Sequence, residues 1–267
     1  MSYKIFETHA HYEDEAFDED RRELIMSLPE NGISYVVNVG SSVETSKECI
    51  RLASRFEHVY AAVGIHPEHA EQGMSAISLD KINTFLKEDK CVALGEIGLD
   101  YHYEDTDEVK NMQYHSFTRQ MDMALSADKP IIVHSRDAAK DTMDYIREFY
   151  GDFKSKNPDK KAGVVHCYSG SAEDAVKYID MGFYIGVGGV VTFKNSKKLK
   201  KVVEEISLED IVIETDAPYM APTPFRGKRN SSLYLPYVIE KIAAIKGVEP
   251  SEVAEITFNN GKRLYRL

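Results

Sequence analysis

Short apolar segments rich in β-branched residues recur along the whole chain, and each is followed by a longer segment with helical spacing. Eight of the short segments are predicted as strands: residues 3–8, 33–39, 59–65, 91–97, 131–134, 163–166, 183–187 and 211–215. Nine of the longer segments are predicted as helices: residues 18–28, 44–56, 79–88, 108–127, 138–150, 172–181, 196–206, 233–246 and 250–263. Strands that alternate with helices form parallel sheets, because a parallel pair needs a long crossover connection.

This alternation restricts the fold to two classes of α/β protein. Eight strand–helix units in 267 residues match the usual size of a (β/α)8 TIM barrel. The alternative is an open, doubly wound sheet, but the glycine patterns GxGxxG and GxxxxGK[ST] are both absent. No repeat, low-complexity tract or Ser/Gly linker interrupts the pattern, so we expect a single-domain TIM barrel over residues 1–267.

Composition excludes several classes of protein. No stretch approaches the ~18 apolar residues of a membrane helix, and the N-terminus lacks a signal-peptide pattern. Cys49, Cys91 and Cys167 form no CxxC pair, which argues against disulfides and zinc ribbons. A net charge of −11 argues against a broad basic surface that coats nucleic acid. The basic run 194–201 is interpreted as a solvated helix face, with a phosphate-binding stripe as the alternative. We expect a cytoplasmic protein with no membrane contact and no obligate protein partner.

Ionisable side chains gather where the predicted strands lead into the following loops. Catalytic groups of TIM barrels lie at this C-terminal edge of the strands. The residues found there are His9, His11, His66, Glu96, His134, His166 and Asp216. His9 and His11 are two residues apart, so in an extended strand both imidazoles lie on one side. A single such histidine is more often packed than ligating, but burying so many ionisable groups without an ion is costly. The set therefore predicts a metal centre.

The types of ligand indicate what this centre holds. Imidazole and carboxylate groups suit Zn, Mn, Fe or Co, whereas Mg or Ca favours a shell richer in oxygen. The predicted ligands are too many for one tetrahedral ion: His9, His11, Glu96, His134, His166 and Asp216. We expect two ions, bridged by Glu96, that activate a water and bind a phosphoryl or carbonyl oxygen. Asp216 is the natural base for that water.

Several short motifs along the full chain are similar to those of one known family. They are FETHAHY, VGIHP, ALGEIGLDYH, PIIVHSRDA, GVVHCYSG and IVIETDAPYMAP followed by FRGKRN. Together they resemble the TatD-type metal-dependent deoxyribonucleases of the amidohydrolase superfamily. The resemblance implies a TIM barrel with two divalent ions, of Mg, Mn or Zn, that hydrolyses phosphodiester bonds in DNA.

The resemblance also implies roles for the predicted site residues. It assigns the ligands as follows: His9, His11 and Asp216 to one ion, His134 and His166 to the second, and Glu96 to both. Asp216 would also be the base, and His66 is similar to the family's histidine near the scissile phosphate. Glu214 would orient a ligand without touching the metal. Cys167 is adjacent to His166, and we expect it to pack away from the metals because neighbours in a strand point to opposite faces.

Candidate substrate contacts surround these ligands: Asp100, Tyr101, His102, Arg136, Arg226, Lys228 and Arg229. Arg136 stands where a side chain could contact phosphate. The stretch 100–102, in the loop after the fourth predicted strand, either lines the substrate cleft or has a structural role. The basic loop 226–229 either guides a nucleic-acid strand or caps the following helix.

Two positions depart from the family's pattern. Glu7 stands where the family has Asp before the HxH motif, which leaves its role open. Ser231 and Ser232 follow RGKRN, where the family has Glu and Pro.

Three functions fit these observations. The first is a metal-dependent deoxyribonuclease, a 3'-5' exonuclease acting on single strands or frayed ends, since an acidic protein with one short basic loop has little to hold a long duplex. The second keeps the barrel and the metals but hydrolyses a small ester, lactone or amide, because fold and metals alone do not fix the substrate. The third is a non-catalytic metal-binding or scaffold protein, which a free base in Asp216 disfavours.

Overall fold

The predicted alternation of strands and helices is present in the computed structural model, which describes residues 3–267. The strands are β1 Ile5–Ala10, β2 Ile33–Val39, β3 Val59–Val63, β4 Cys91–Asp100, β5 Ile131–Arg136, β6 Gly163–Val165, β7 Phe183–Val187 and β8 Ile211–Ile213. The helices are α1 Arg21–Ser27, α2 Val43–Arg55, α3 Ala70–Gly73, α4 Ala76–Phe85, α5 Asp107–Ser126, α6 Ala139–Tyr150, α7 Phe153–Lys156, α8 Ala172–Asp180, α9 Lys197–Glu205, α10 Leu235–Lys246 and α11 Pro250–Tyr265.

The strands form one parallel sheet in which every strand pairs with the next in the sequence, from β1 to β8. The sheet closes on itself where the chain beyond β8 meets β1. There the hydroxyl of Thr8 donates to the carbonyl of Ile213 over 2.9 Å. The backbone N–H of Asp216 donates to the carbonyl of His9 over 3.0 Å, and Ala10 and Ala217 form a parallel bridge. The prediction of a TIM barrel is confirmed, and the open sheet is excluded.

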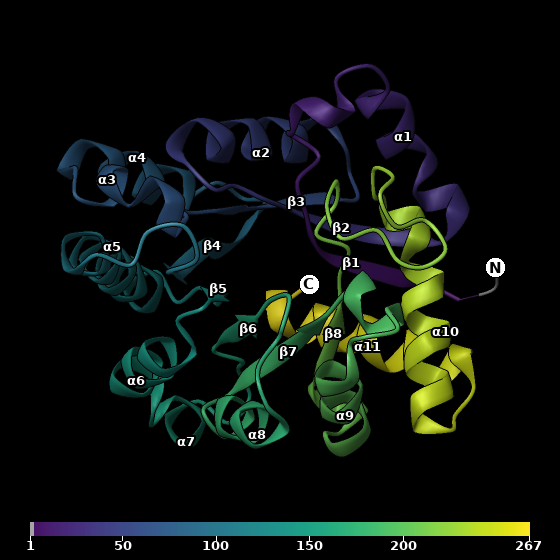
Figure 1. The fold of residues 1–267 in the computed structure, drawn as a ribbon. Coiled ribbons are helices and arrows are strands. Elements are labelled where there is room, and N and C mark those ends of the chain that lie inside the picture. Colours follow the sequence, from purple (N-terminus) through teal and green to yellow (C-terminus); the bar gives the residue numbers. More distant parts are fainter. Residues whose placement is uncertain (1–2) are drawn as a thin grey trace.

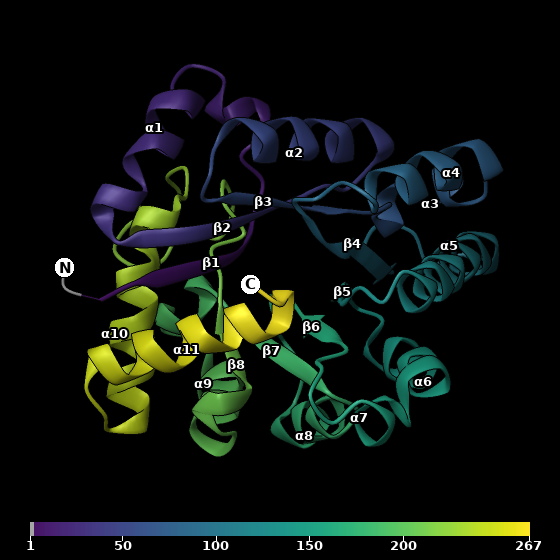
Figure 2. The ribbon, with the colours of Figure 1, turned by 180° about the vertical axis from the view of Figure 1, so that it is seen from behind.

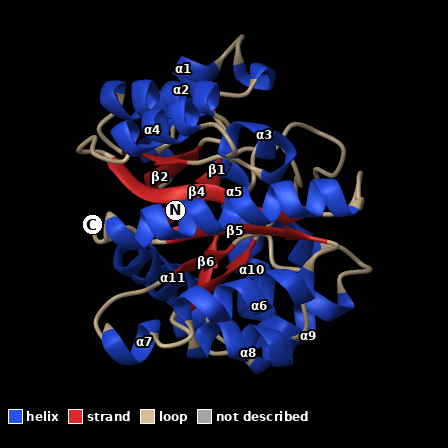
Figure 3. Ribbon diagram, turned by 90° about the vertical axis from the view of Figure 1, so that its left-hand side faces the viewer, coloured by secondary structure: helices blue, strands red, loops and turns tan. Residues whose placement is uncertain are grey.

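Apolar side chains fill two layers. The helices form a ring outside the strands, and most of the buried apolar residues lie between the two (Figures 1 and 3). A second cluster fills the barrel interior: Phe6, Val37, Val39, Ala62, Val92, Ala93, Ile132, Val164, Tyr184, Val212, Leu264 and Tyr265. Its last two members belong to α11, which crosses the barrel in the view from behind (Figure 2). The interior is thus a packed core closed by the C-terminal helix.

The observed elements differ from the predicted ones mainly at their ends. β4 and β5 run on to Asp100 and Arg136, because these residues continue the parallel pairing of the two strands. α4 begins at Ala76 rather than residue 79, since the hydroxyl of Ser75 accepts a hydrogen bond from the backbone of Ser78 and caps the helix. The four-residue helices α3 and α7 were not predicted.

Two observations bear on the predictions made from composition. All three cysteines are free, as expected. Within residues 3–267, no helix combines the length and the apolar character that crossing a membrane requires.

Candidate metal centre

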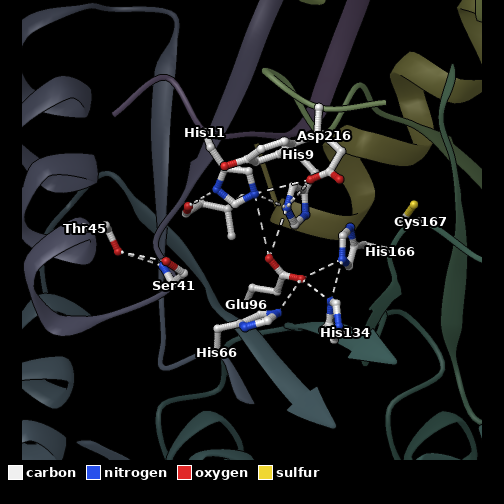
Figure 4. Close-up of polar contacts among 12 residues, drawn as sticks. His9, His11, Ser41, Thr45, His66, Glu96, His134, His166, Cys167 and Asp216 are labelled. Atoms are coloured by element: carbon white, nitrogen blue, oxygen red, sulfur yellow. Dashed lines mark hydrogen bonds and ion pairs between the residues drawn. The ribbon is translucent and has the colours of Figure 1, made fainter. Parts of the chain in front are cut away.

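The predicted ligands come together at the C-terminal edge of the barrel, with Glu96 of β4 in their middle (Figure 4). Parallel strands end at the same edge of a sheet, so residues far apart in the sequence meet there. Glu96 is buried, and so are His9 and His11 at the end of β1 and His166 just after β6. His134 and Asp216 are mostly buried. The two carboxylate oxygens of Glu96 face different groups of histidines.

Oε2 of Glu96 faces the pair of histidines from β1. It lies 3.5 Å from Nε2 of His9 and 3.8 Å from Nε2 of His11. Oδ1 of Asp216 lies on the same side, 3.7 Å from Nε2 of His9 and 3.4 Å from Nε2 of His11. The two Nε2 atoms are only 3.0 Å apart. Both imidazoles and both carboxylates therefore converge on one small volume.

Oε1 of Glu96 faces a second group. It lies 2.7 Å from Nδ1 of His134 and 2.7 Å from Nε2 of His166. Nε2 of His66 is 3.7 Å away, and its ring packs edge-on against that of His134 with 4.3 Å between centroids. Glu96 thus joins the two groups through its two oxygens.

Groups behind the imidazoles orient them. Nδ1 of His11 lies 2.8 Å from the carbonyl oxygen of Val39, which can only accept, so Nδ1 carries a proton and Nε2 faces the centre. Nε2 of His134 lies 3.0 Å from Oδ2 of Asp100, which turns its Nδ1 toward Glu96. Histidines that bind metals in proteins are commonly oriented in this way by a carbonyl or a carboxylate.

The electrostatics of the pocket favour positive charge on His11 and His134. Burial lowers the pKa of His11, but Asp216 and Glu13 raise it well above its usual value. Burial likewise opposes the protonation of His134, but Asp100 and Glu96 raise its pKa to about 9. The carboxylates that stabilise the protonated imidazoles of His11 and His134 would also stabilise a bound cation. A divalent ion would therefore compete with protons for the imidazole nitrogens.

The residues fit a metal site. Three groups of side chains each place their ligand atoms within 4.8 Å of one another: His9, His11 and Glu96; His66, Glu96 and His134; and His9, His166 and Glu214. Nδ1 of His9 and Nδ1 of His166 are buried without a hydrogen-bond partner among the described residues. Unpaired buried polar atoms are costly, and a donor set of imidazoles and carboxylates suits a divalent transition metal. No cysteine takes part, and the sulfur of Cys167 points away from the cluster (Figure 4).

Glu7, one of the two departures from the family's pattern, is fully buried beneath the ligands and accepts four hydrogen bonds. Its Oε1 accepts from the backbone N–H groups of His9 and Thr215, over 3.1 and 2.9 Å. Its Oε2 accepts from the hydroxyls of Thr215 and Ser232, over 2.6 and 2.9 Å. Burial raises the pKa of Glu7 to about 7, although these hydrogen bonds lower it. The second departure, Ser232, thus contacts the first, and the pair joins β1 to the chain beyond β8.

We predict that Ser232→Ala destabilises the protein by about 1–3 kcal/mol, the cost of leaving a buried acceptor short of a donor. Urea unfolding followed by circular dichroism measures the effect. Ser54→Ala, which removes an exposed hydroxyl on α2, is the matched control and should change stability by less than about 0.5 kcal/mol. Equal unfolding midpoints for the two variants would contradict the role given to Ser232.

Three of the predicted substrate contacts at β4 and β5, Tyr101, His102 and Arg136, lie outside the cluster, whereas Asp100 contacts His134 within it. The hydroxyl of Tyr101 donates to Asp141 over 3.1 Å, and Nδ1 of His102 lies 2.8 Å from the carboxylate of Asp137. Arg136 is exposed at the end of β5, its guanidinium 5.2 Å from the ring centroid of Tyr103. Of these side chains, Arg136 has no carboxylate within ion-pairing distance in the described part of the chain.

The three basic residues of the loop after β8 differ in their surroundings. Arg229 makes two hydrogen bonds to the carboxylate of Asp20, over 2.7 and 2.6 Å, so it ties the loop to the start of α1. Arg226 and Lys228 are exposed, and neither makes an ion pair with any residue that the structure describes. Only the latter two remain free for a ligand.

Two carboxylates of the site depart from the sequence predictions: Asp100 has a different role, and Glu13 was not predicted. Asp100, predicted as a substrate contact in a loop, is the buried last residue of β4 and pairs with His134. Its spacing of four from Glu96 was a usable signal, since residues i and i+4 of a strand lie on one face. Glu13 lies 3.4 Å from Nδ1 of His11 and accepts a hydrogen bond from Asn38. Only its nearness to the HxH motif could have indicated it.

Comparison with known proteins identifies the family. Residues 6–266 match the family described as TatD related DNase. The chain belongs to this family. It is 39% identical over 263 residues to the uncharacterized metal-dependent hydrolase YabD of Bacillus subtilis (strain 168), covering 98% of this chain and 99% of that protein. The motif resemblance is confirmed, and the protein is a TatD-family metal-dependent hydrolase with an amidohydrolase-like fold.

Two further TatD-family relatives extend the comparison. The chain is 28% identical over 256 residues to the 3'-5' ssDNA/RNA exonuclease TatD of Salmonella typhimurium, covering 94% of this chain and 95% of that protein. The crystal structure of YjjV, a TatD homolog from Escherichia coli K12, superposes with a TM-score of 0.88 at 27% identity and covers 98% of both chains. Sequence and fold therefore agree along nearly the whole length.

Proposed function

We propose that the protein is a metal-dependent 3'-5' exonuclease that hydrolyses phosphodiester bonds in single-stranded DNA. The observation that carries the proposal is the position of Glu96. Its Oε2 faces His9 and His11, and its Oε1 faces His134 and His166 at 2.7 Å. A carboxylate with one oxygen toward each of two imidazole groups is suited to bridge two divalent ions, of Mg, Mn or Zn.

The predicted ligands divide between the two positions: His9, His11 and Asp216 for one ion, His134 and His166 for the other, and Glu96 for both. When bound, two such ions would activate a water and offset the negative charge of a phosphoryl oxygen. In the protein, Asp216 receives the proton of the attacking water. Burial raises the pKa of Asp216, but His11 holds it below the usual range, so this carboxylate is ionised and able to accept.

His66 supplies a neutral hydrogen-bond donor beside Oε1 of Glu96 and the ring of His134. Its Nδ1 accepts from the backbone N–H of Glu68 over 3.2 Å, so the proton is on Nε2, which faces Glu96. Burial lowers the pKa of His66 to about 3, which keeps the ring neutral. Such a donor stabilises charge that develops on a phosphoryl oxygen. Arg136, exposed at the rim, is placed to contact a neighbouring phosphate.

The substrate class rests on the Salmonella relative, whose name describes a 3'-5' ssDNA/RNA exonuclease. Two features of this chain support a single strand over a duplex. Its net charge of −11 leaves little attraction for a long duplex, and its basic side chains near the site are few.

Incubation of the purified protein with end-labelled single-stranded DNA and Mn or Mg tests the proposal. We expect stepwise shortening from the 3' end, and no cleavage by a His134→Ala variant. His115→Ala, a substitution on the surface of α5, is the matched control and should cleave at the normal rate. If the wild-type protein cleaves the DNA no faster than His134→Ala does, the proposed nuclease activity is excluded. Turnover of a panel of small esters and lactones in its place would favour the second hypothesis.

A further inference from the structure

The basic run 194–201 has no place in the proposed chemistry, yet contacts connect it to the loop that leaves the metal centre. That loop begins at Asp216. Gly189, just after β7, packs so closely on it that a Cβ there would lie 2.2 Å from the carbonyl oxygen of Met220. Further along, the backbone N–H of Thr223 donates to the hydroxyl of Thr192 over 2.8 Å. The segment leading into α9 and the loop after β8 therefore form one continuous surface.

Four cations lie on this surface without a carboxylate partner. Arg226 stacks on Phe193, with 4.1 Å from its guanidinium carbon to the ring centroid. Lys194, which directly follows Phe193 in the chain, is exposed. Lys197 and Lys228 are also exposed. In the part of the chain that the structure describes, no ion pair involves any of the four. We call Lys194, Lys197, Arg226 and Lys228 the basic surface.

Two other lysines of the run, Lys200 and Lys201, are engaged elsewhere. Nζ of Lys200 donates to the carbonyl of Phe193, which ties the start of α9 to the preceding turn. Lys201 pairs with Glu205 over 3.4 Å. The acidic side chains that face the run from α8 are Glu173 and Asp174, and they lie near Lys201 and Lys198. The prediction that the run is a solvated helix face thus describes part of it only.

Aromatic rings lie beside the basic surface. Phe225 stacks on Tyr234 with centroids 4.2 Å apart and an interplanar angle of 7°, and Tyr237 meets Phe225 edge-on at 5.2 Å. Lys228 lies over the ring of Phe225, 5.9 Å from its centroid. Tyr237 is 37% exposed, so its ring is open to a ligand. Cations that follow a phosphate backbone, next to aromatic faces that accept bases, are typical of proteins that bind single strands.

We propose that the basic surface binds the single-stranded DNA that extends from the metal centre, through its phosphates, while the aromatic group stacks its bases. This proposal rests on the proposed nuclease function. It also explains how a chain of net charge −11 holds a polyanion: the cations that bind it are concentrated on one side of the site.

The test compares two doubly substituted proteins. Lys194→Glu with Lys197→Glu reverses two charges of the basic surface, and Lys47→Glu with Lys81→Glu reverses two exposed charges on α2 and α4, across the barrel from α9 (Figure 1). Fluorescence anisotropy with a labelled thymidine oligonucleotide, in the presence of a chelator, measures binding without cleavage. We expect the first pair of substitutions to raise Kd for the oligonucleotide at least about tenfold. The slope of log K against log salt concentration should become shallower by about 0.7 for each phosphate contact that is lost. The second pair should differ little from wild type.

Cleavage assays separate this proposal from the proposed function. The p-nitrophenyl ester of thymidine 5'-phosphate is too short to reach the basic surface, so its kcat/KM should be the same in wild type and the first pair, while kcat/KM for the oligonucleotide falls. If wild type cleaves neither substrate, the nuclease proposal fails, and the anisotropy still tests binding. If the two doubly substituted proteins have equal Kd values and equal slopes of log K against log salt, the basic surface does not bind the strand.

The aromatic group is tested separately. Tyr237→Ala should weaken binding of the single strand by roughly fivefold or more, since each stacked base contributes appreciably, and should leave duplex binding unchanged. An equal loss for single strand and duplex would exclude stacking.

Discussion

Replacing Glu96 with Gln is expected to lower the rate of DNA cleavage by more than about 100-fold, beyond the loss typical of groups that only orient a metal ligand. Gln keeps the size of the side chain but removes the charge that both groups of histidines face. An amide also offers one carbonyl oxygen, whereas Glu96 presents Oε1 to His134 and Oε2 to His9. The variant should therefore fold, but bind fewer ions than the wild-type protein.

Initial rates on end-labelled single-stranded DNA, together with elemental analysis of the purified protein, measure both effects. Glu88→Gln is the matched control, because Glu88 is exposed and lies shortly before β4, at the opposite end of the strand from the site. Retention of two ions and of more than a tenth of the wild-type rate by Glu96→Gln would rule out the bridging role.

Replacing Asp216 with Asn is expected to lower kcat by about 10²- to 10⁴-fold, the range over which a positioned general base accelerates a reaction. Asn preserves the shape of the side chain near His11, but it accepts no proton from the attacking water. KM for the DNA should change much less, since Asp216 acts on the water and not on the strand.

Asp14→Asn controls for a change of charge in the same neighbourhood. The carboxylate of Asp14 accepts from the hydroxyl of Tyr219 over 2.9 Å and lies outside the ligand cluster. Steady-state kinetics and the metal content of both variants distinguish a lost base from a lost ligand. A wild-type kcat in Asp216→Asn would mean that another group takes the proton.

Much of the fold and of the candidate site could be predicted because both depend on local patterns. Alternating apolar segments gave the strand order, and the position of His9, His134 and Asp216 at strand ends placed them at one edge. What could not be predicted depends on pairing between strands. β4 continues to Asp100 only because β5 continues beside it, so the contact of Asp100 with His134 is a property of their register.

The loop after β8 was the least predictable part of the site, because its conformation is fixed by distant partners. Asp20 engages Arg229, Thr192 engages Thr223, and Glu7 engages Ser232. None of these pairs has a spacing that a sequence pattern could reveal, since the two members of each pair lie 31 or more residues apart in the chain. The departures at Glu7 and Ser232 looked independent in the sequence, yet they form one hydrogen bond.

The closure between β1 and the chain beyond β8 has a consequence for synthesis of the protein. The backbone of His9 pairs with that of Asp216, and the interior behind them is covered by Leu264 and Tyr265 of α11. Contacts between residues so distant in the sequence form late and slowly during folding. On the ribosome, the histidines of β1 emerge long before Asp216 and α11 can reach them. A nascent chain therefore has no assembled catalytic centre, and hydrolytic activity begins only once the barrel has closed.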